Sequence, residues 1–248
     1  MDMTDNSDPF LPRGEPPADE PQPFLRLPLA VGLLAGLLVA AHAARAFLPV
    51  ATSNGIIANY ALIPARYSHA FLTAHHLDGG SLLDRALPFA TYIFLHASWT
   101  HVGLNTLWLL AFGPLVARRF GVVRFFVFFL VCGVAGAATH LTFNWGSIDP
   151  VIGASAGVSG LMGASFRLIG SGPMSAETRK PLTPLLSRQI LTWTALWAAL
   201  NVFAGLTGLG AGPGVQTIAW QAHLGGYFAG LFLCGLFDPV ARLNRRAH

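Results

Sequence analysis

The fold is decided by a glycine-rich stretch in the middle of the chain, Gly153-Ala154-Ser155-Ala156-Gly157-Val158-Ser159-Gly160-Leu161-Met162-Gly163. The stretch opens with the pattern G-x-S-x-G and continues in small residues, which are typical of a membrane helix that packs closely against its neighbours. A serine at the mouth of such a helix is a candidate nucleophile inside the bilayer. The rest of the chain would then have to supply a base and donors for an oxyanion.

The composition is that of a membrane protein. The chain is 53% hydrophobic and only 10% charged, whereas a soluble domain carries about 25% charged residues. The net charge of +4 does not indicate a nucleic-acid partner, because the arginines lie between apolar segments and form no basic stripe. We therefore expect the lipid bilayer, and no nucleic acid, as the surroundings of this chain.

Apolar segments long enough for membrane helices occur six times. They lie near residues 27–48, 98–117, 122–143, 152–169, 189–208 and 219–237. A long loop, about 49–90, separates the first two and has apolar residues of its own, so we expect it to be partly embedded or interfacial. The predicted fold is an all-α bundle of six transmembrane helices.

The two ends of the chain differ from this membrane unit. Residues 1–23 hold six of the eleven acidic residues and six prolines, which predicts a disordered cytoplasmic tail and no cleaved presequence. Residues 24–240 form the predicted membrane domain, and 241–248 form a basic cytoplasmic tail.

Basic residues predict the orientation. Twelve of the fifteen arginines and lysines lie before the first segment, in or next to the connections between the second and third and between the fourth and fifth, or after the sixth. Because cytoplasmic loops are enriched in these residues, both termini should be cytoplasmic and the long first loop should lie outside. Arg45, Arg66 and Arg85 remain for the outer side.

This orientation brings four polar residues to one level. The second, fourth and sixth segments all run inward, and each has its notable polar residues near its beginning: His101 and Asn105, Ser155, and His223. A helix from Ser155 to Ile169 would be roughly 22 Å long at 1.5 Å per residue, shorter than a hydrocarbon core of about 30 Å. Ser155 should therefore lie below the outer membrane surface.

The four residues suggest a hydrolytic site. His223 is the best candidate base for Ser155, and a Ser–His dyad is expected because no Asp or Glu lies inside a predicted span. His101 and Asn105 are four residues apart, so they share a helix face, and with the Ser155 amide they could form an oxyanion hole. Gly226 and Gly230 have the spacing that allows close helix approach.

Each feature has a plainer interpretation when taken alone. A G-x-S-x-G match in an apolar helix is more typical of packing, and a single membrane histidine is more typical of a polar network. Their common depth favours the catalytic interpretation. We expect no cofactor and no metal, since no H-E-x-x-H motif is present and metal binding by the loop histidines (His69, His75, His76) has no support.

Four further polar residues are expected to have structural roles. His96 should brace the first loop, and Asn201 should form a hydrogen bond to a neighbouring helix. His140 and Asn144 should belong to the polar rim of the bundle.

The chain resembles the rhomboid family of intramembrane serine proteases. The resemblance rests on His96-Ala-Ser-Trp-Thr-His101-Val-Gly-Leu-Asn105, Gly153-Ala-Ser155-Ala-Gly157, Ala222-His223-Leu-Gly-Gly226-Tyr-Phe-Ala-Gly230 and Ile63-Pro64-Ala65-Arg66. It covers about residues 60–240 and suggests the bacterial, six-helix form.

The resemblance implies specific roles. Ser155 would be the nucleophile and His223 the general base and acid, with His101, Asn105 and the Ser155 amide as oxyanion donors. The first loop would lie in the outer leaflet, and the fifth helix with the loop after it would gate substrate access. Trp193 and Trp197 are candidate gate residues, although lipid-facing aromatic anchors fit equally well.

The sequence departs from the family at one position. Family members often have an aromatic residue four positions after the serine, where it can pack on the histidine, and here that residue is Ser159. Orientation of the histidine must then rely on other contacts, such as a hydrogen bond.

Three functions remain open at this stage. The favoured one is a serine endopeptidase that cleaves transmembrane protein substrates, as a multi-pass protein of the bacterial inner (plasma) membrane. An inactive relative would bind membrane proteins for quality control. A small transporter or channel would use the polar cluster as a pathway, but the polar residues do not continue inward and no inverted repeat is evident.

Overall fold

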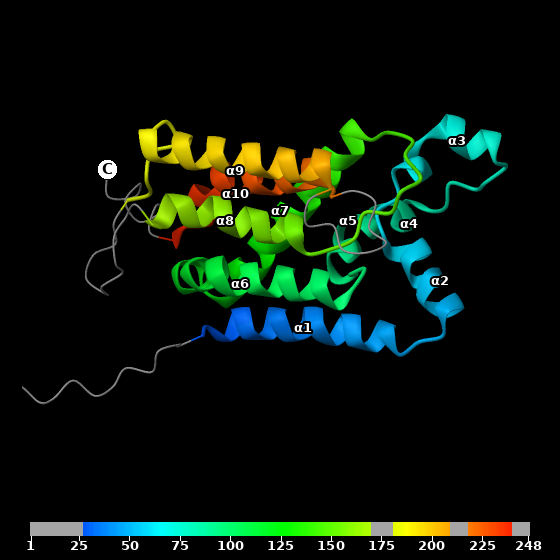
Figure 1. Cartoon of the computed structure of the whole chain (residues 1–248), viewed down its shortest axis with the longest axis horizontal. Coiled ribbons are helices and arrows are strands. Elements are labelled where there is room, and N and C mark those ends of the chain that lie inside the picture. Colours follow the sequence, from blue (N-terminus) through cyan, green and yellow to red (C-terminus); the bar gives the residue numbers. More distant parts are fainter. Residues whose placement is uncertain (1–26, 170–180, 209–217, 240–248) are drawn as a thin grey trace, which may run out of the picture.

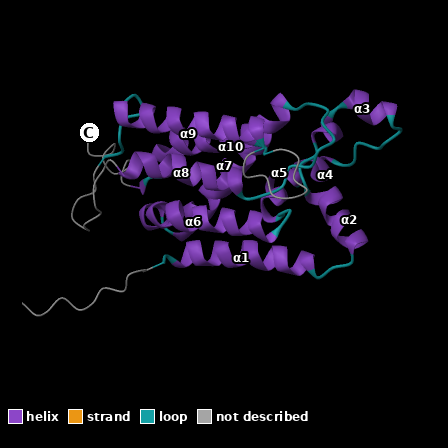
Figure 2. Cartoon of the chain, viewed as in Figure 1, coloured by secondary structure: helices purple, strands orange, loops and turns teal. Residues whose placement is uncertain are grey.

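A computed structural model describes residues 27–169, 181–208 and 218–239, which form helices joined by short connections (Figures 1 and 2). Within these ranges the only β-type pairing is an isolated antiparallel bridge between Leu62 and Val151. The chain is therefore all-α, as predicted. The predicted tails 1–23 and 241–248 lie outside the described residues.

Six long helices correspond to the six predicted segments, and each predicted end lies within three residues of the observed one. They are α1 (Leu29–Ala46), α6 (Trp99–Phe120), α7 (Val122–Phe143), α8 (Ser155–Ile169), α9 (Arg188–Thr207) and α10 (Trp220–Phe237). The predicted long loop is filled by short helical elements: α2 (Val50–Tyr60), η1 (Pro64–Tyr67), α3 (His69–Ala74), α4 (Leu82–Ala86), α5 (Pro88–Thr91) and η2 (Tyr92–Phe94).

The long helices lie side by side, and α8 is the central one. It packs against α6, α7 and α10, while α1 packs on α6 and α9 on the outer side of α10 (Figure 1). Eleven of the fifteen residues of α8 are buried. The elements α2 to α5 gather at one end of the bundle, and α6, α8 and α10 all begin at that end (Figure 1). The predicted parallel direction of these three helices is confirmed.

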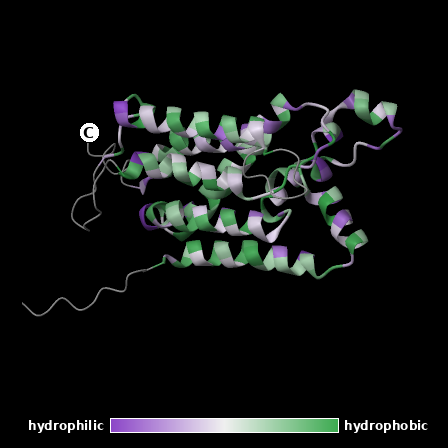
Figure 3. Ribbon diagram, viewed as in Figure 1, coloured by the Kyte–Doolittle hydropathy of each residue, from purple (hydrophilic) through white to green (hydrophobic). Residues whose placement is uncertain are grey.

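Four of the six long helices are long and apolar enough to cross a membrane. By length and composition α1, α6, α7 and α9 could each cross a membrane, and the long helices are mostly hydrophobic (Figure 3). The other two of the six do not meet that criterion: α8 has only fifteen residues, and α10 begins with polar residues that include Gln221 and His223. Helix α8 is largely buried, and α10 packs against α7, α8 and α9, so neighbouring helices rather than lipid lie against the polar groups at their beginnings.

The contact between α8 and α10 has no room for side chains. A Cβ at Gly226 would overlap the carbonyl oxygen of Ala156, and a Cβ at Gly230 would overlap that of Gly160. At Gly163 a Cβ would lie 2.5 Å from the carbonyl oxygen of Tyr227. The two backbones therefore touch directly, as the small residues predicted.

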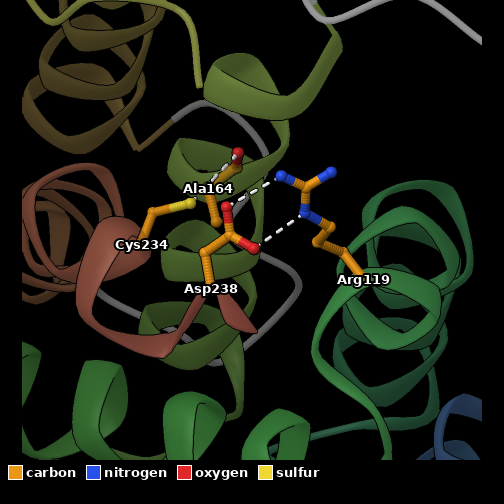
Figure 4. A network of polar contacts seen from close by, with 4 residues as sticks. All are labelled: Arg119, Ala164, Cys234 and Asp238. Atoms are coloured by element: carbon orange, nitrogen blue, oxygen red, sulfur yellow. Dashed lines mark hydrogen bonds and ion pairs between the residues drawn. The ribbon is translucent and has the colours of Figure 1, made fainter. Parts of the chain in front are cut away.

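The far ends of α6 and α10 are joined by a buried ion pair. The Arg119 guanidinium donates two hydrogen bonds of 2.8 Å to the two carboxylate oxygens of Asp238, and beside it the thiol of Cys234 faces the carbonyl oxygen of Ala164 (Figure 4). A two-pronged arrangement satisfies both charges, which a buried pair requires. The pair fixes the end of α10 that lies opposite His223.

A methyl group at Gly230 should separate α8 from α10. We expect Gly230→Ala to lower the free energy of unfolding by about 1–3 kcal/mol, because overpacked sites must shift backbone. The midpoint of thermal unfolding in detergent measures this. The matched control is Gly36→Ala on α1, where a Cβ would meet nothing within 4 Å; it should leave the midpoint unchanged or raise it. Equal effects of the two substitutions would contradict the close contact.

Candidate active site

The segment that leads into Ser155 is held by the long first loop, at the end of the bundle where α6, α8 and α10 begin. Leu62 and Val151 exchange two backbone hydrogen bonds, of 3.2 and 2.8 Å, and the Gly153 amide donates to the Tyr92 carbonyl at 3.0 Å. The Tyr92 hydroxyl in turn donates to the carbonyl of Gly133 on α7 at 2.8 Å. These contacts connect the start of α8 to residues far away in the chain.

His96 adds a side-chain contact to the same segment. Its ring is fully buried, and Nε2 accepts a hydrogen bond of 3.4 Å from the Ala154 amide. Its carbonyl oxygen accepts from the Arg45 guanidinium at the end of α1. His96 was predicted to brace the first loop. Its side chain also contacts the residue before Ser155.

Ser155 and His223 face each other across the α8–α10 contact. The Ser155 Oγ lies 2.8 Å from His223 Nε2, which is hydrogen-bond distance. The other ring nitrogen, Nδ1, lies 2.8 Å from the side-chain oxygen of Asn201 on α9. The Asn201 amide nitrogen also donates to the Trp220 carbonyl at 3.0 Å, so the predicted bond to a neighbouring helix is present.

The contact between Asn201 and His223 was missed in the sequence. An amide side chain in the middle of a largely apolar helix was a signal that a hydrogen-bond partner existed. Which partner it was depends on the rotation of α9 about its axis, and the apolar residues around that helix do not specify it. Because Ser159 stands where family members often have an aromatic residue, the orientation of His223 has to rely on another contact. The hydrogen bond to Asn201 is such a contact. Ser159 itself is buried in α8.

His101 and Asn105 lie on the first turns of α6, on the face toward Gly153. Helix α6 is capped by Ser98, whose Oγ accepts from the His101 amide at 3.1 Å. His101 Nδ1 accepts from the Ala97 amide at 3.4 Å, so the proton of the neutral ring is on Nε2. The Asn105 amide nitrogen donates to the His101 carbonyl at 3.0 Å, and its second hydrogen remains for another acceptor.

Gly153 lies where the two donors approach the start of α8. Its φ of +121° is a backbone conformation that other residues rarely adopt, and a Cβ there would lie 2.7 Å from His101 Nε2 and 3.7 Å from Asn105 Nδ2. The absence of a side chain at this position lets both groups reach the backbone next to Ser155. Their role as oxyanion donors stays a prediction.

The remaining candidates lie outside this cluster. The Asn144 amide nitrogen donates to the carbonyl of His140 at 3.0 Å, so these two residues pair with each other. His75 contacts the carbonyl of Phe71 in the first loop. Of the two tryptophans, Trp193 is 48% exposed, whereas Trp197 stacks on Tyr227 of α10 with ring centroids 4.1 Å apart. In the part of the chain that is described, no three histidine, cysteine or acidic residues come together as a metal site.

This geometry can transfer a proton and stabilise an anion. His223 is placed to take the Ser155 hydroxyl proton, and Asn201 is placed to hold the opposite side of the ring. The side-chain nitrogens of His101 and Asn105 lie beside Gly153. Serine hydrolases need a nucleophile, a base, an orienting group and oxyanion donors in this relation.

Comparison with known proteins places most of the chain in one family. A family model described as the rhomboid domain matches residues 84–238, which include all of the site residues on α6, α8, α9 and α10. "Rhomboid-like protein 11, chloroplastic" of Arabidopsis thaliana is 33% identical over 161 residues, covering 63% of this chain and 55% of that protein.

Two other relatives match a similar region. "Rhomboid protease GluP" of Bacillus subtilis (strain 168) is 30% identical over 142 residues, which are 57% of this chain and 24% of that protein. "RHOMBOID-like protein 1" of Arabidopsis thaliana is 29% identical over 154 residues, 59% of this chain and 33% of that protein. The chain thus spans about half or less of the length of these curated relatives.

A side chain at residue 153 should disturb the site more than the fold. We expect Gly153→Ala to slow labelling of Ser155 by a fluorophosphonate about 10²–10³-fold, which is the range for loss of one oxyanion donor, because the methyl displaces His101. Gly146→Ala is the matched control: its φ is +83°, but a Cβ there meets nothing within 4 Å. Labelling of Gly153→Ala at the rate of Gly146→Ala would show that this contact is not part of the site.

Proposed function

The chain belongs to the rhomboid family, and from that premise we propose that it is a serine endopeptidase that cleaves transmembrane segments of other membrane proteins within the bilayer. The observation that carries the proposal is the 2.8 Å contact between Ser155 Oγ and His223 Nε2 at the start of a buried helix. Polar and ionisable groups inside a membrane bundle are energetically costly, and where they occur they usually mark a functional site.

The proposed reaction is acyl transfer to serine followed by hydrolysis. His223 Nε2 takes the hydroxyl proton as Ser155 Oγ attacks the scissile carbonyl carbon. The amide of Ser155, His101 Nε2–H and an Asn105 N–H stabilise the oxyanion. The C–N bond then breaks, and His223 returns the proton to the leaving amine. A water molecule, deprotonated by His223, attacks the acyl carbon. The ester bond to Ser155 Oγ then breaks, His223 returns the proton to that oxygen, and the second product leaves with its new carboxyl group.

Transmembrane segments are the substrate class that this site favours. Ser155 begins a helix of fifteen residues within a bundle of longer ones, so the scissile bond must come to it below the membrane surface. A helical substrate must unwind there before its backbone reaches Ser155. We therefore expect small or helix-breaking residues near the cut, since glycine and proline weaken a helix.

The proposed membrane arrangement keeps both chain ends on one side. Arg118, Arg119, Arg124 and Arg188 lie at or next to the ends of α6, α7 and α9 that are opposite the first loop. This distribution supports the orientation with cytoplasmic termini, in the bacterial plasma membrane that the resemblance suggested. Residues 24–240 would act as one membrane unit between two cytoplasmic tails.

Cleavage of a reporter with a single transmembrane segment tests the proposal. The wild-type protein should cut it, and both Ser155→Ala and His223→Ala should reduce cleavage by at least about 10³-fold, because the two groups act as a unit. Ser159→Ala is the matched control on the same helix, and it should keep most of the activity.

Two outcomes would contradict the assignment. Cleavage that persists in Ser155→Ala would exclude this serine as the nucleophile. A folded wild-type protein that binds transmembrane proteins but cuts none would favour the alternative of an inactive, binding relative.

A further inference from the structure

We propose that Asn201 is a positioning residue for His223: its side-chain oxygen holds the imidazole in the orientation and tautomer that leave Nε2 free to accept the Ser155 proton. The inference rests on the proposed function. It adds a residue on α9 to the pair formed by Ser155 on α8 and His223 on α10.

The directions of these hydrogen bonds follow from the Trp220 carbonyl group, which can only accept. The Trp220 carbonyl oxygen can only accept, so the Asn201 atom 3.0 Å from it must be the NH₂ group. The Asn201 oxygen then faces His223 Nδ1 at 2.8 Å and can itself only accept. Nδ1 must carry the ring proton, and Nε2, 2.8 Å from Ser155 Oγ, must carry the lone pair.

The Trp220 carbonyl also determines which end of the Asn201 amide faces His223. Where asparagine replaces the aspartate of a serine protease triad, turnover falls about 10⁴-fold because the imidazole is held in the wrong tautomer. Here the inverted amide would point its NH₂ group at His223 and its oxygen at the Trp220 carbonyl. That arrangement loses the hydrogen bond to Trp220, so the productive amide orientation is favoured.

A neutral group also suits this environment. In α8, α9 and α10, all of whose residues are described, there is no Asp or Glu. A carboxylate at this depth would have to be desolvated. An amide oxygen orients the ring without that cost.

One face of α9 brings Asn201 to the site. Thr194, Trp197, Asn201 and Gly205 follow one another at helical spacing toward α10. The hydroxyl groups of Thr194 and Tyr227 are 2.7 Å apart, and a Cβ at Gly205 would overlap the Trp220 indole. Most large apolar side chains elsewhere on α9 are exposed: Leu191, Leu196, Leu200, Phe203 and Leu206. This face of α9, here called the α9 seam, therefore packs against α10. Asn201 is the residue of the seam that contacts His223.

Two variants distinguish the positioning of His223 by Asn201 from a general contribution of the α9 seam to packing. Asn201→Leu keeps the side-chain size and removes both hydrogen bonds. Thr194→Val removes the other hydrogen bond of the α9 seam, about two turns away, and is the matched control. We expect Asn201→Leu to lower kcat for the reporter about 10²–10⁴-fold, as loss of the orienting group does in serine proteases, with KM within a few fold. Thr194→Val should keep kcat within about threefold, even if the two variants lose similar thermal stability.

A spectroscopic measurement on the wild-type protein keeps the inference testable if Asn201→Leu does not fold. Nitrogen-15 NMR of histidine-labelled protein at neutral pH should show His223 with its proton on Nδ1; the signal is assigned by its loss in His223→Gln. A proton on Nε2 in the wild type would overturn the inference. So would a kcat of Asn201→Leu within threefold of the wild type, or a loss no greater than that of Thr194→Val.

These outcomes are distinct from failure of the proposed function. If the wild-type protein cleaves nothing, the peptidase assignment fails, while the tautomer still decides whether Asn201 orients His223. If wild type is active, Ser155→Ala is inactive and Asn201→Leu matches wild type, only the positioning role fails.

Discussion

Direct contact between the backbones of α8 and α10 is the constraint on which the site depends. Gly226 and Gly230 lie against the carbonyl oxygens of Ala156 and Gly160. Ser155 directly precedes Ala156, and His223 lies one turn before Gly226. The contact therefore determines how near the side chains of Ser155 and His223 can come. Larger residues on either helix would separate the backbones and lengthen the 2.8 Å contact between Ser155 and His223.

A second constraint is the low polarity of the surroundings. The site is built from hydroxyl, imidazole, carboxamide and backbone groups, which are neutral and can satisfy one another by hydrogen bonds. The one buried ion pair described, between Arg119 and Asp238, lies at the opposite end of α10 and has two matched hydrogen bonds. A charged pair thus connects α6 to α10 at one end of the bundle, while the site at the other end consists of neutral groups.

The helices could be predicted from the sequence because apolar length is a direct requirement of the bilayer. Their common direction followed from the arginines, and from it the shared level of His101, Ser155 and His223. The close contact between α8 and α10 could also be predicted from the sequence, because only small residues allow it.

The parts that could not be predicted depend on long-range contacts. Leu62 pairs with Val151 and His96 contacts Ala154, and neither partner has a periodic pattern that indicates the other. Asn201 was recognised as a hydrogen-bonding residue, but its contact with His223 depends on the rotation of α9. The different surroundings of Trp193 and Trp197 have the same cause: one is half exposed and the other stacks on Tyr227.

We propose that α8 and α10 bring His223 to Ser155 and so make this serine a nucleophile. Mass-spectrometric mapping of the adduct formed by a fluorophosphonate in the intact, folded protein tests this most directly. We expect one adduct, on Ser155, that is lost when His223 is replaced by alanine. An adduct on another residue, or an adduct on Ser155 that forms equally well without His223, would contradict it.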